Sequence, residues 1–283
     1  MSLYIKKAFE LTKENIVLAQ PPIFFMIIFS ITFAALATQT VKLYYIIFSA
    51  ANIMLCTAFL AGWFYMIKKG IEHFKKAQNG GYKDDKEKAS VSFALGKEFF
   101  PGVGEYFPQV TYTTVIFVIL SAILAYASFK FGVYHLPKPD INWTEFMSVA
   151  NSTPAEMQKY VYGLSFEQLK ALNIWMLYLG GIFTVFSFLT MFLFPTVMDC
   201  KEEGFKKLLI PFIAFNKNLV FLFKNFVGAI GVVAFLFLLN IFMSLLSLIF
   251  NMNFILAIIG LILSFYVMTY AVILIFLFYE ERK

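Results

Sequence analysis

The longest uncharged stretch of this chain runs from Asn225 to Tyr279, fifty-five residues without one Asp, Glu, Lys or Arg. A charged side chain at the centre of a bilayer costs about 2.5 kcal/mol or more, so such a stretch is typical of a chain that lies in hydrocarbon. One crossing takes about 20 apolar residues, so this stretch is long enough for two. The Asn251-Met252-Asn253 interruption predicts a tight turn between them.

The rest of the chain has the same character, with 60% hydrophobic and 14% charged residues. A soluble domain has roughly a quarter of its residues charged. Six segments are apolar and long enough to cross a membrane: about Pro21–Thr38, Leu43–Ile67, Val110–Phe129, Ala171–Val197, Phe226–Phe250 and Phe254–Phe278. The sequence therefore predicts an all-α polytopic bundle, a single transmembrane domain over residues 1–283. We expect its first helix to be retained rather than cleaved as a signal peptide.

The basic residues predict an orientation for this bundle. If the N-terminus is inside, 18 of the 23 Lys and Arg fall in cytoplasmic segments, and an even number of crossings puts both termini there. Excess lysine marks the cytoplasmic side of membrane proteins. We therefore attribute the net charge of +6 to topology and expect no nucleic-acid partner. The expected location is the cell inner (plasma) membrane.

Amphipathic stretches precede the first, third and fifth crossings. In residues 1–19, Tyr4, Ala8 and Leu11 share one helical face and Lys6 and Glu10 share another. Residues 199–224 have the same pattern, and residues 88–100 have a weaker one. Such helices lie in the headgroup plane of a membrane. Their order suggests a threefold repeat of interface helix and transmembrane hairpin, the alternative being chance similarity among Phe- and Lys-rich segments.

Two longer segments connect predicted spans. Residues 68–109 are expected as a cytoplasmic loop. Residues 131–170 are expected outside as a small helical cap, because Thr153-Pro154 reads as a helix start, Gly163 as its end, and Ser165 as the start of a helix that continues into the fourth crossing.

Catalytic and metal-binding patterns are absent from the sequence. The chain has no HExxH, GxSxG or P-loop motif. Its two histidines, His73 and His135, are predicted on opposite sides of the membrane. Cys56 and Cys200 show no metal-ligand spacing. We expect a protein that is not an enzyme and needs no cofactor. A lipid-modifying enzyme would need a cluster formed by Glu72, His73 and the charge run at Asp84 and Asp85.

Lysines next to the predicted spans are candidates for anionic lipid headgroups, each worth about 1 kcal/mol near such a surface. They are Lys68, Lys69, Lys75, Lys76, Lys206 and Lys207. The alternative is that these lysines only fix the topology.

Polar side chains inside the spans are candidates for lining a cavity. They are Asn52, Asn240, Thr184, Ser187 and Tyr270. For the asparagines, the alternative is an interhelical hydrogen bond. No Asp, Glu, Lys or Arg lies at mid-span, which argues against ion-coupled transport. Pro195 and Pro211 either bend or end a helix.

The layout resembles a loose superfamily of prokaryotic six-helix membrane proteins. It includes the YciC-like proteins and the membrane domain attached to some glycerophosphodiester phosphodiesterases. The resembling residues are Ile5–Asn15 before a proline-led first crossing, and Asp199–Phe205, which lead an amphipathic helix before the fifth crossing. The resemblance implies the architecture and a prokaryotic inner membrane. It carries no catalytic residues, because the phosphodiesterase domain has no counterpart here.

Two functions remain open at this point. The first is a non-enzymatic membrane subunit or scaffold that organises lipid or a partner protein. The alternative is a transporter or export component for a lipid-like or apolar substrate without ion coupling. A cavity between hairpins lined by the polar candidates would favour transport, and a solidly packed bundle would favour the scaffold.

Overall fold

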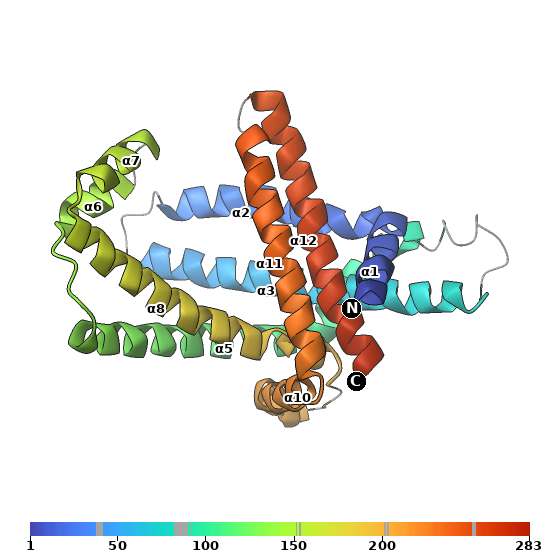
Figure 1. Ribbon diagram of the computed structural model, residues 1–283. Coiled ribbons are helices and arrows are strands. Elements are labelled where there is room, and N and C mark those ends of the chain that lie inside the picture. Colours follow the sequence, from blue (N-terminus) through green and yellow to red (C-terminus); the bar gives the residue numbers. More distant parts are fainter. Residues whose placement is uncertain are drawn as a thin grey trace. The chain divides into compact units, whose positions relative to one another are not determined.

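The computed structural model describes residues 1–37, 42–81, 90, 92–150, 152, 154–200, 202, 204–250 and 253–283. Across these ranges every regular element is an α-helix or a short 3-10 helix, and none is a strand (Figure 1). Six of the helical stretches are long and apolar enough to span a membrane. The prediction of an all-α, multi-pass membrane protein is confirmed.

The chain divides into two compact units, which are described separately. Unit 1 contains residues Met1–Ile116 and Leu189–Lys283, and unit 2 contains Phe117–Phe188. The boundaries fall inside two of the long helices, α5 (Phe99–His135) and α8 (Phe166–Thr190).

The first transmembrane hairpin of unit 1 joins α2 (Gln20–Ala37) to α3 (Lys42–Gln78). The ring of Phe25 in α2 stacks on Phe59 in α3 with centroids 4.1 Å apart. The Thr32 hydroxyl donates a hydrogen bond to Asn52 Oδ1 at 2.6 Å. Aromatic stacking and one interhelical hydrogen bond therefore hold the pair together.

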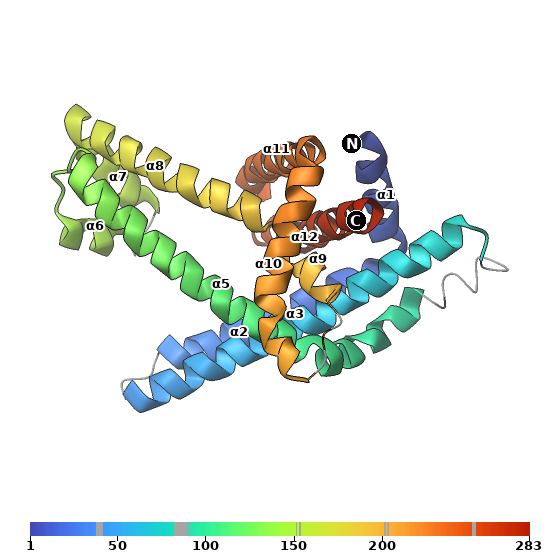
Figure 2. The same ribbon diagram turned by 90° about the horizontal axis from the view of Figure 1, so that it is seen from below.

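The second hairpin of unit 1 joins α11 (Phe226–Phe250) to α12 (Phe254–Arg282), which run side by side in both views (Figures 1 and 2). Of the turn expected between them, residues 251 and 252 lie outside the described ranges. Asn253 caps α12, its Oδ1 accepting a hydrogen bond from the Leu256 N–H at 2.9 Å. In the apolar part of α12, 44% of the residues are buried, whereas at most 17% are buried in the apolar parts of the other five spans. α12 is thus the span most enclosed by protein.

An amphipathic helix precedes each of these hairpins. In α1 (Ser2–Glu14), Ala8 and Leu11 are fully buried while Lys6 and Lys13 are exposed, as the pattern predicts. A 3-10 turn, η1 (Ile16–Ala19), then leads into α2. Before α11 comes α10 (Ile210–Lys224).

The two helix junctions are built alike. The side-chain amide of Asn15 donates to the Leu11 carbonyl at 3.0 Å, and that of Asn225 donates to the Phe221 carbonyl at 3.1 Å. In each junction the same carbonyl also accepts the backbone N–H of the asparagine at 3.0 Å, so one residue bonds it twice where the helix ends. The middle copy of the proposed repeat has the short 3-10 helix η2 (Leu95–Glu98) before α5, and residues 82–89 and 91 lie outside the described ranges. The shared junction favours the repeat, which stays a prediction.

The fourth predicted crossing, Ala171–Val197, is not one continuous helix. α8 ends at Thr190, and the short helix α9 begins at Leu193 and ends at Met198. The cause is Pro195. A proline has no backbone N–H to donate to the carbonyl four residues earlier, and its ring clashes with that carbonyl, so the helix is interrupted before it.

The freed backbone groups at this break meet a buried amide. Asn218 of α10 is fully buried; its Nδ2 donates to the Leu189 carbonyl at 2.6 Å, and its Oδ1 accepts from the Phe192 N–H at 3.1 Å. One side chain thus replaces two backbone hydrogen bonds that the break removes.

Both ends of the expected cytoplasmic loop 68–109 are helical, and its place relative to the membrane stays a prediction. α3 continues without a break from its apolar part to Gln78, because it contains no proline, and Gly80 beyond its end has a φ of +71°. At the other end, α5 already begins at Phe99, where Pro101 is tolerated in the first turn. The charge run at Asp84 and Asp85 lies outside the described ranges.

In unit 2, α6 (Trp143–Ala150) and α7 (Pro154–Gly163) follow α5 and precede α8 along the chain. The predicted bounds of α7 are confirmed, although Thr153 itself is not described. The predicted start of α8 is also confirmed. Ser165 N–H donates to Gln168 Oε1 at 2.9 Å and Gln168 N–H donates to Ser165 Oγ at 3.2 Å, which is a reciprocal capping box.

Helix α6 was missed by the sequence argument. Asn142 Oδ1 accepts hydrogen bonds from the N–H groups of Thr144 and Glu145 at 3.1 and 3.3 Å. An N-cap residue followed three positions later by Glu is a helix-start signal, so Asn142-Trp-Thr-Glu145 could have found this helix.

Candidate functional site

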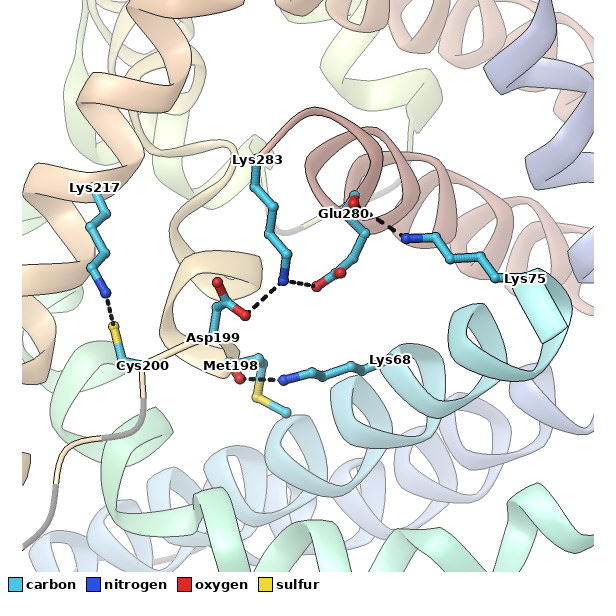
Figure 3. A network of polar contacts seen from close by, with 8 residues as sticks. All are labelled: Lys68, Lys75, Met198, Asp199, Cys200, Lys217, Glu280 and Lys283. Carbon is cyan, nitrogen blue, oxygen red and sulfur yellow. Dashed lines mark hydrogen bonds and ion pairs between the residues drawn. The ribbon is translucent and has the colours of Figure 1, made fainter.

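A polar network gathers the ends of several helices of unit 1 (Figure 3). Lys68 of α3 donates to the carbonyl of Met198, the last residue of α9, at 2.7 Å. One heptad further along α3, Lys75 donates to the carbonyl of Glu280 in the last turn of α12 at 3.2 Å. The last carbonyls of a helix have no intrahelical partner and carry partial negative charge. Two lysines predicted to meet lipid headgroups therefore bind helix ends of their own chain.

Lys283 closes the same network from the other side. Its ammonium group lies 2.7 Å from Asp199 Oδ1 and 3.0 Å from Glu280 Oε1. Burial alone would lower the pKa of Lys283, but the hydrogen bonds and charges of the two carboxylates outweigh burial and raise it. The lysine stays charged, and the contact joins the end of α12 to the residue that follows α9. Because all three side chains are partly exposed, this ion pair adds little stability.

Cys200 lies at the edge of the network. The ammonium group of Lys217 on α10 lies 3.9 Å from its sulfur. Burial raises the pKa of the Cys200 thiol, and Lys217 lowers it by a smaller amount, so the net shift is upward. A raised pKa leaves less thiolate at a given pH, and the thiolate is the reactive form.

We expect Cys200 to react slowly with a water-soluble maleimide. In a Cys56→Ser background, the folded protein at pH 7.5 should react several-fold more slowly than the same chain in denaturing detergent, and its rate should rise at a higher pH than that of a free thiol. Adding Lys217→Met should slow the folded protein further, because it removes the charge that favours the thiolate. Equal folded and denatured rates, or a faster Lys217→Met variant, would contradict this assignment.

The other lysine candidates are distributed as follows. Lys69 forms an ion pair with Glu72, its Nζ 2.8 Å from Oε2. Lys76 and Lys206 are exposed, and Lys207 is part-exposed. The six lysines do not form one surface, and the geometry divides them into two that hold helix ends and four on the outside of unit 1.

Helix α1 is fastened along one edge to the end of α12. Arg282 Nε donates to Tyr4 Oη at 2.8 Å, and Lys7 Nζ lies 2.8 Å from Glu281 Oε1. The Tyr270 hydroxyl donates to the Ile5 carbonyl at 3.4 Å. The charged edge of α1 thus meets the charged end of α12.

The opposite edge of α1 borders an apolar groove, which we call the α1 groove. It has a volume of about 560 Å³ and is lined by α1, α11 and α12. The lining residues are Ser2, Ile5, Lys6, Phe9, Phe235, Leu239, Leu263, Tyr266, Val267 and Tyr270. Lys6 and two tyrosines are among the lining residues, and nearly all of the lining surface is apolar. A lining of this kind suits an apolar ligand.

The polar cavity candidates are not brought to one place. Asn52 is buried; its Oδ1 accepts from Thr32, and its Nδ2 donates to the Phe48 carbonyl at 2.9 Å. Only Tyr270 lines the α1 groove, whereas Asn240 is exposed elsewhere on α11. Thr184 and Ser187 belong to unit 2 and are exposed on α8. The Thr184 hydroxyl donates to the Gly180 carbonyl one turn earlier in the same helix.

A second apolar pocket of about 440 Å³ lies elsewhere in unit 1, against the hairpin of α2 and α3 and the start of α5. Phe24, Phe25, Phe59 and Phe99 are among its lining residues, and Gln20 is a polar one. The aromatic residues gave no sequence signal for a pocket, because the same residue types fill every span.

Unit 2 has a pocket of about 670 Å³ in its cap, lined by polar and apolar residues from Ile141 to Gln168. Glu145, Glu156 and Lys159 are its charged members. Asn142 and Gln168 are placed in this pocket by their role as caps of α6 and α8. The three charged side chains are exposed. Throughout the described ranges, no three His, Cys, Asp or Glu residues are grouped closely enough to hold a metal ion.

Comparisons of the chain with models of known families, with curated proteins and with solved structures gave no match. The class that fold and surface define is a multi-pass helical membrane protein with interface helices.

Proposed function

We propose that this protein is a non-enzymatic membrane subunit or scaffold that organises lipid, with the α1 groove as the lipid-binding surface. The observation behind the proposal is that Lys6 lies beside an apolar groove formed by α1 and the middle turns of α11 and α12. The proposed location is the inner membrane, with both termini on the cytoplasmic side. That orientation puts Lys6 at the leaflet whose anionic lipids attract lysine.

The proposed occupant is one phospholipid with an anionic headgroup. Its acyl chain would lie along Leu239, Leu263 and Val267, and its headgroup would meet the ammonium group of Lys6. Lys6 has one weak partner, Glu10 Oε1 at 3.9 Å, and its side chain is 76% exposed. A headgroup phosphate can therefore approach without displacing a strong ion pair.

Removing the Lys6 charge should weaken retention of anionic lipid. In protein extracted with its surrounding lipid, Lys6→Gln should lower the ratio of anionic to zwitterionic lipid retained by about fivefold, the equivalent of about 1 kcal/mol. Native mass spectrometry of the lipid-bound species measures this ratio.

The matched control is Lys13→Gln, because Lys13 is an exposed lysine of the same helix that does not line the groove. A loss equal to that of Lys6→Gln would show general attraction to the membrane surface rather than a site. A second variant, Val267→Phe, should reduce retention of both lipid classes by filling the groove. Unchanged retention in both groove variants would exclude the proposal.

A second candidate function is movement of a lipid-like substrate without ion coupling. The specific observation that favours it is the second apolar pocket, in the same unit as the α1 groove. Proteoliposomes with a fluorescent phospholipid, quenched from outside, would separate the two functions. A scaffold leaves half of the fluorescence protected, whereas a transporter lets the outer quencher reach nearly all of it.

A further inference from the structure

Asn240 is a polar side chain on an exposed face near the middle of the membrane span α11. Within the described part of the chain no hydrogen-bond partner contacts its amide. In hydrocarbon there is no water to supply one, so an amide left in this state costs free energy.

Other side-chain amides of unit 1 differ from Asn240 in their hydrogen bonds or in their burial. Asn52 is bonded to Thr32 and to the Phe48 carbonyl, and Asn218 is bonded to two backbone groups. Gln109 has an oxygen without a partner among the described residues, but its side chain is buried inside the protein rather than turned outward. Asn240 combines an exposed position with an unpartnered amide.

Two serines continue the polar surface along the same side of α11. Ser244 and Ser247 follow Asn240 at spacings of four and three, so the three side chains lie on one helical face, and all three are exposed. Ser247 Oγ donates to the Ser244 carbonyl at 2.7 Å, which keeps its hydroxyl against the helix. Small residues beside an amide allow a second helix to approach closely.

We propose that this Asn240 face is the interface with a second copy of the same chain. An amide carries both a donor and an acceptor, so two Asn240 side chains related by a two-fold axis can satisfy each other with two hydrogen bonds. The face has no charged residue that would demand an opposite charge on a different partner. Apolar neighbours on α11, among them Phe237, Ile241 and Leu248, are exposed and extend the contact area. The interface is independent of the α1 groove, which uses Phe235 and Leu239 of the same helix.

The test measures association in lipid bilayers, by energy transfer between donor- and acceptor-labelled full-length chains in proteoliposomes. The wild-type protein should associate specifically, and Asn240→Leu should weaken association by about five- to thirtyfold. Asn240→Gln keeps the amide and should retain most of it. The matched control Asn216→Leu removes an exposed amide from α10 and should have no effect.

Cross-linking tests which face is involved. In a background without native cysteines, Ser244→Cys should form an intermolecular disulfide on mild oxidation. Leu245→Cys, at a position that is also exposed but on another side of α11, should not. A monomeric wild-type protein, association unchanged by Asn240→Leu, or equal cross-linking at both positions would overturn the proposal. In the monomeric case, the Asn240 face would be covered by lipid or by another segment of the same chain.

Discussion

Asn218→Leu is expected to destabilise unit 1 more than any other single polar-to-apolar change discussed. The substitution removes the side-chain partner of the Leu189 carbonyl and of the Phe192 N–H, and Phe192 is buried while Leu189 is half-buried. Each unsatisfied buried group costs about 1–3 kcal/mol, so the expected loss is about 2–6 kcal/mol. Unfolding of the purified protein in mixed micelles with increasing denaturing detergent measures it.

The controls separate the hydrogen bonds from the loss of an amide as such. Asn216→Leu, at an exposed position of the same helix, should change stability by less than about 0.5 kcal/mol. Pro195→Ala should reduce the cost of Asn218→Leu, because a helix without proline can supply partners for its own backbone. Additive effects of Pro195→Ala and Asn218→Leu would refute the coupling between the break and the amide.

Trp63→Ala is expected to have the second largest effect. Trp63 is 3% exposed, its ring stacks on Phe59 with centroids 5.6 Å apart, and its indole N–H donates to the Leu18 carbonyl at 2.8 Å. Removing a buried tryptophan typically costs about 3–5 kcal/mol. The same unfolding measurement should therefore show a large shift.

Trp63→Phe divides this loss into its parts. It keeps much of the packing and removes the hydrogen bond to η1, so it should cost about 1–3 kcal/mol less than Trp63→Ala. Trp143→Ala, at a residue 54% exposed in α6, is the matched tryptophan control and should be nearly neutral. A Trp63→Ala protein as stable as this control would show that the indole has no core role.

The six spans and the two clear amphipathic stretches were predictable because lipid imposes a simple rule on composition. Long charge-free segments and a polar edge at helical spacing are visible without any knowledge of contacts. The ends of the spans were less visible. Proline rules allowed either a bend or an end at Pro195, and only the position of Asn218 shows why a break inside the protein is tolerated.

The candidate site was harder to predict, because the sequence does not show whether a lysine contacts a lipid phosphate or a backbone carbonyl. Lys68 and Lys75 share a face of α3 with a spacing of seven, and that face meets the ends of α9 and α12 rather than lipid. Lys6 was noted only as part of a polar edge. Its importance comes from the groove beside it, which depends on where α11 and α12 pass.

The attachment of α1 to α12 has a consequence for biogenesis. The partners of Tyr4 and Lys7 are Arg282 and Glu281, more than 270 positions later in the chain. A ribosome delivers the first helix long before these partners exist. Until translation reaches the final span, α1 lacks these partners, so its docking onto α12 is a late event of assembly.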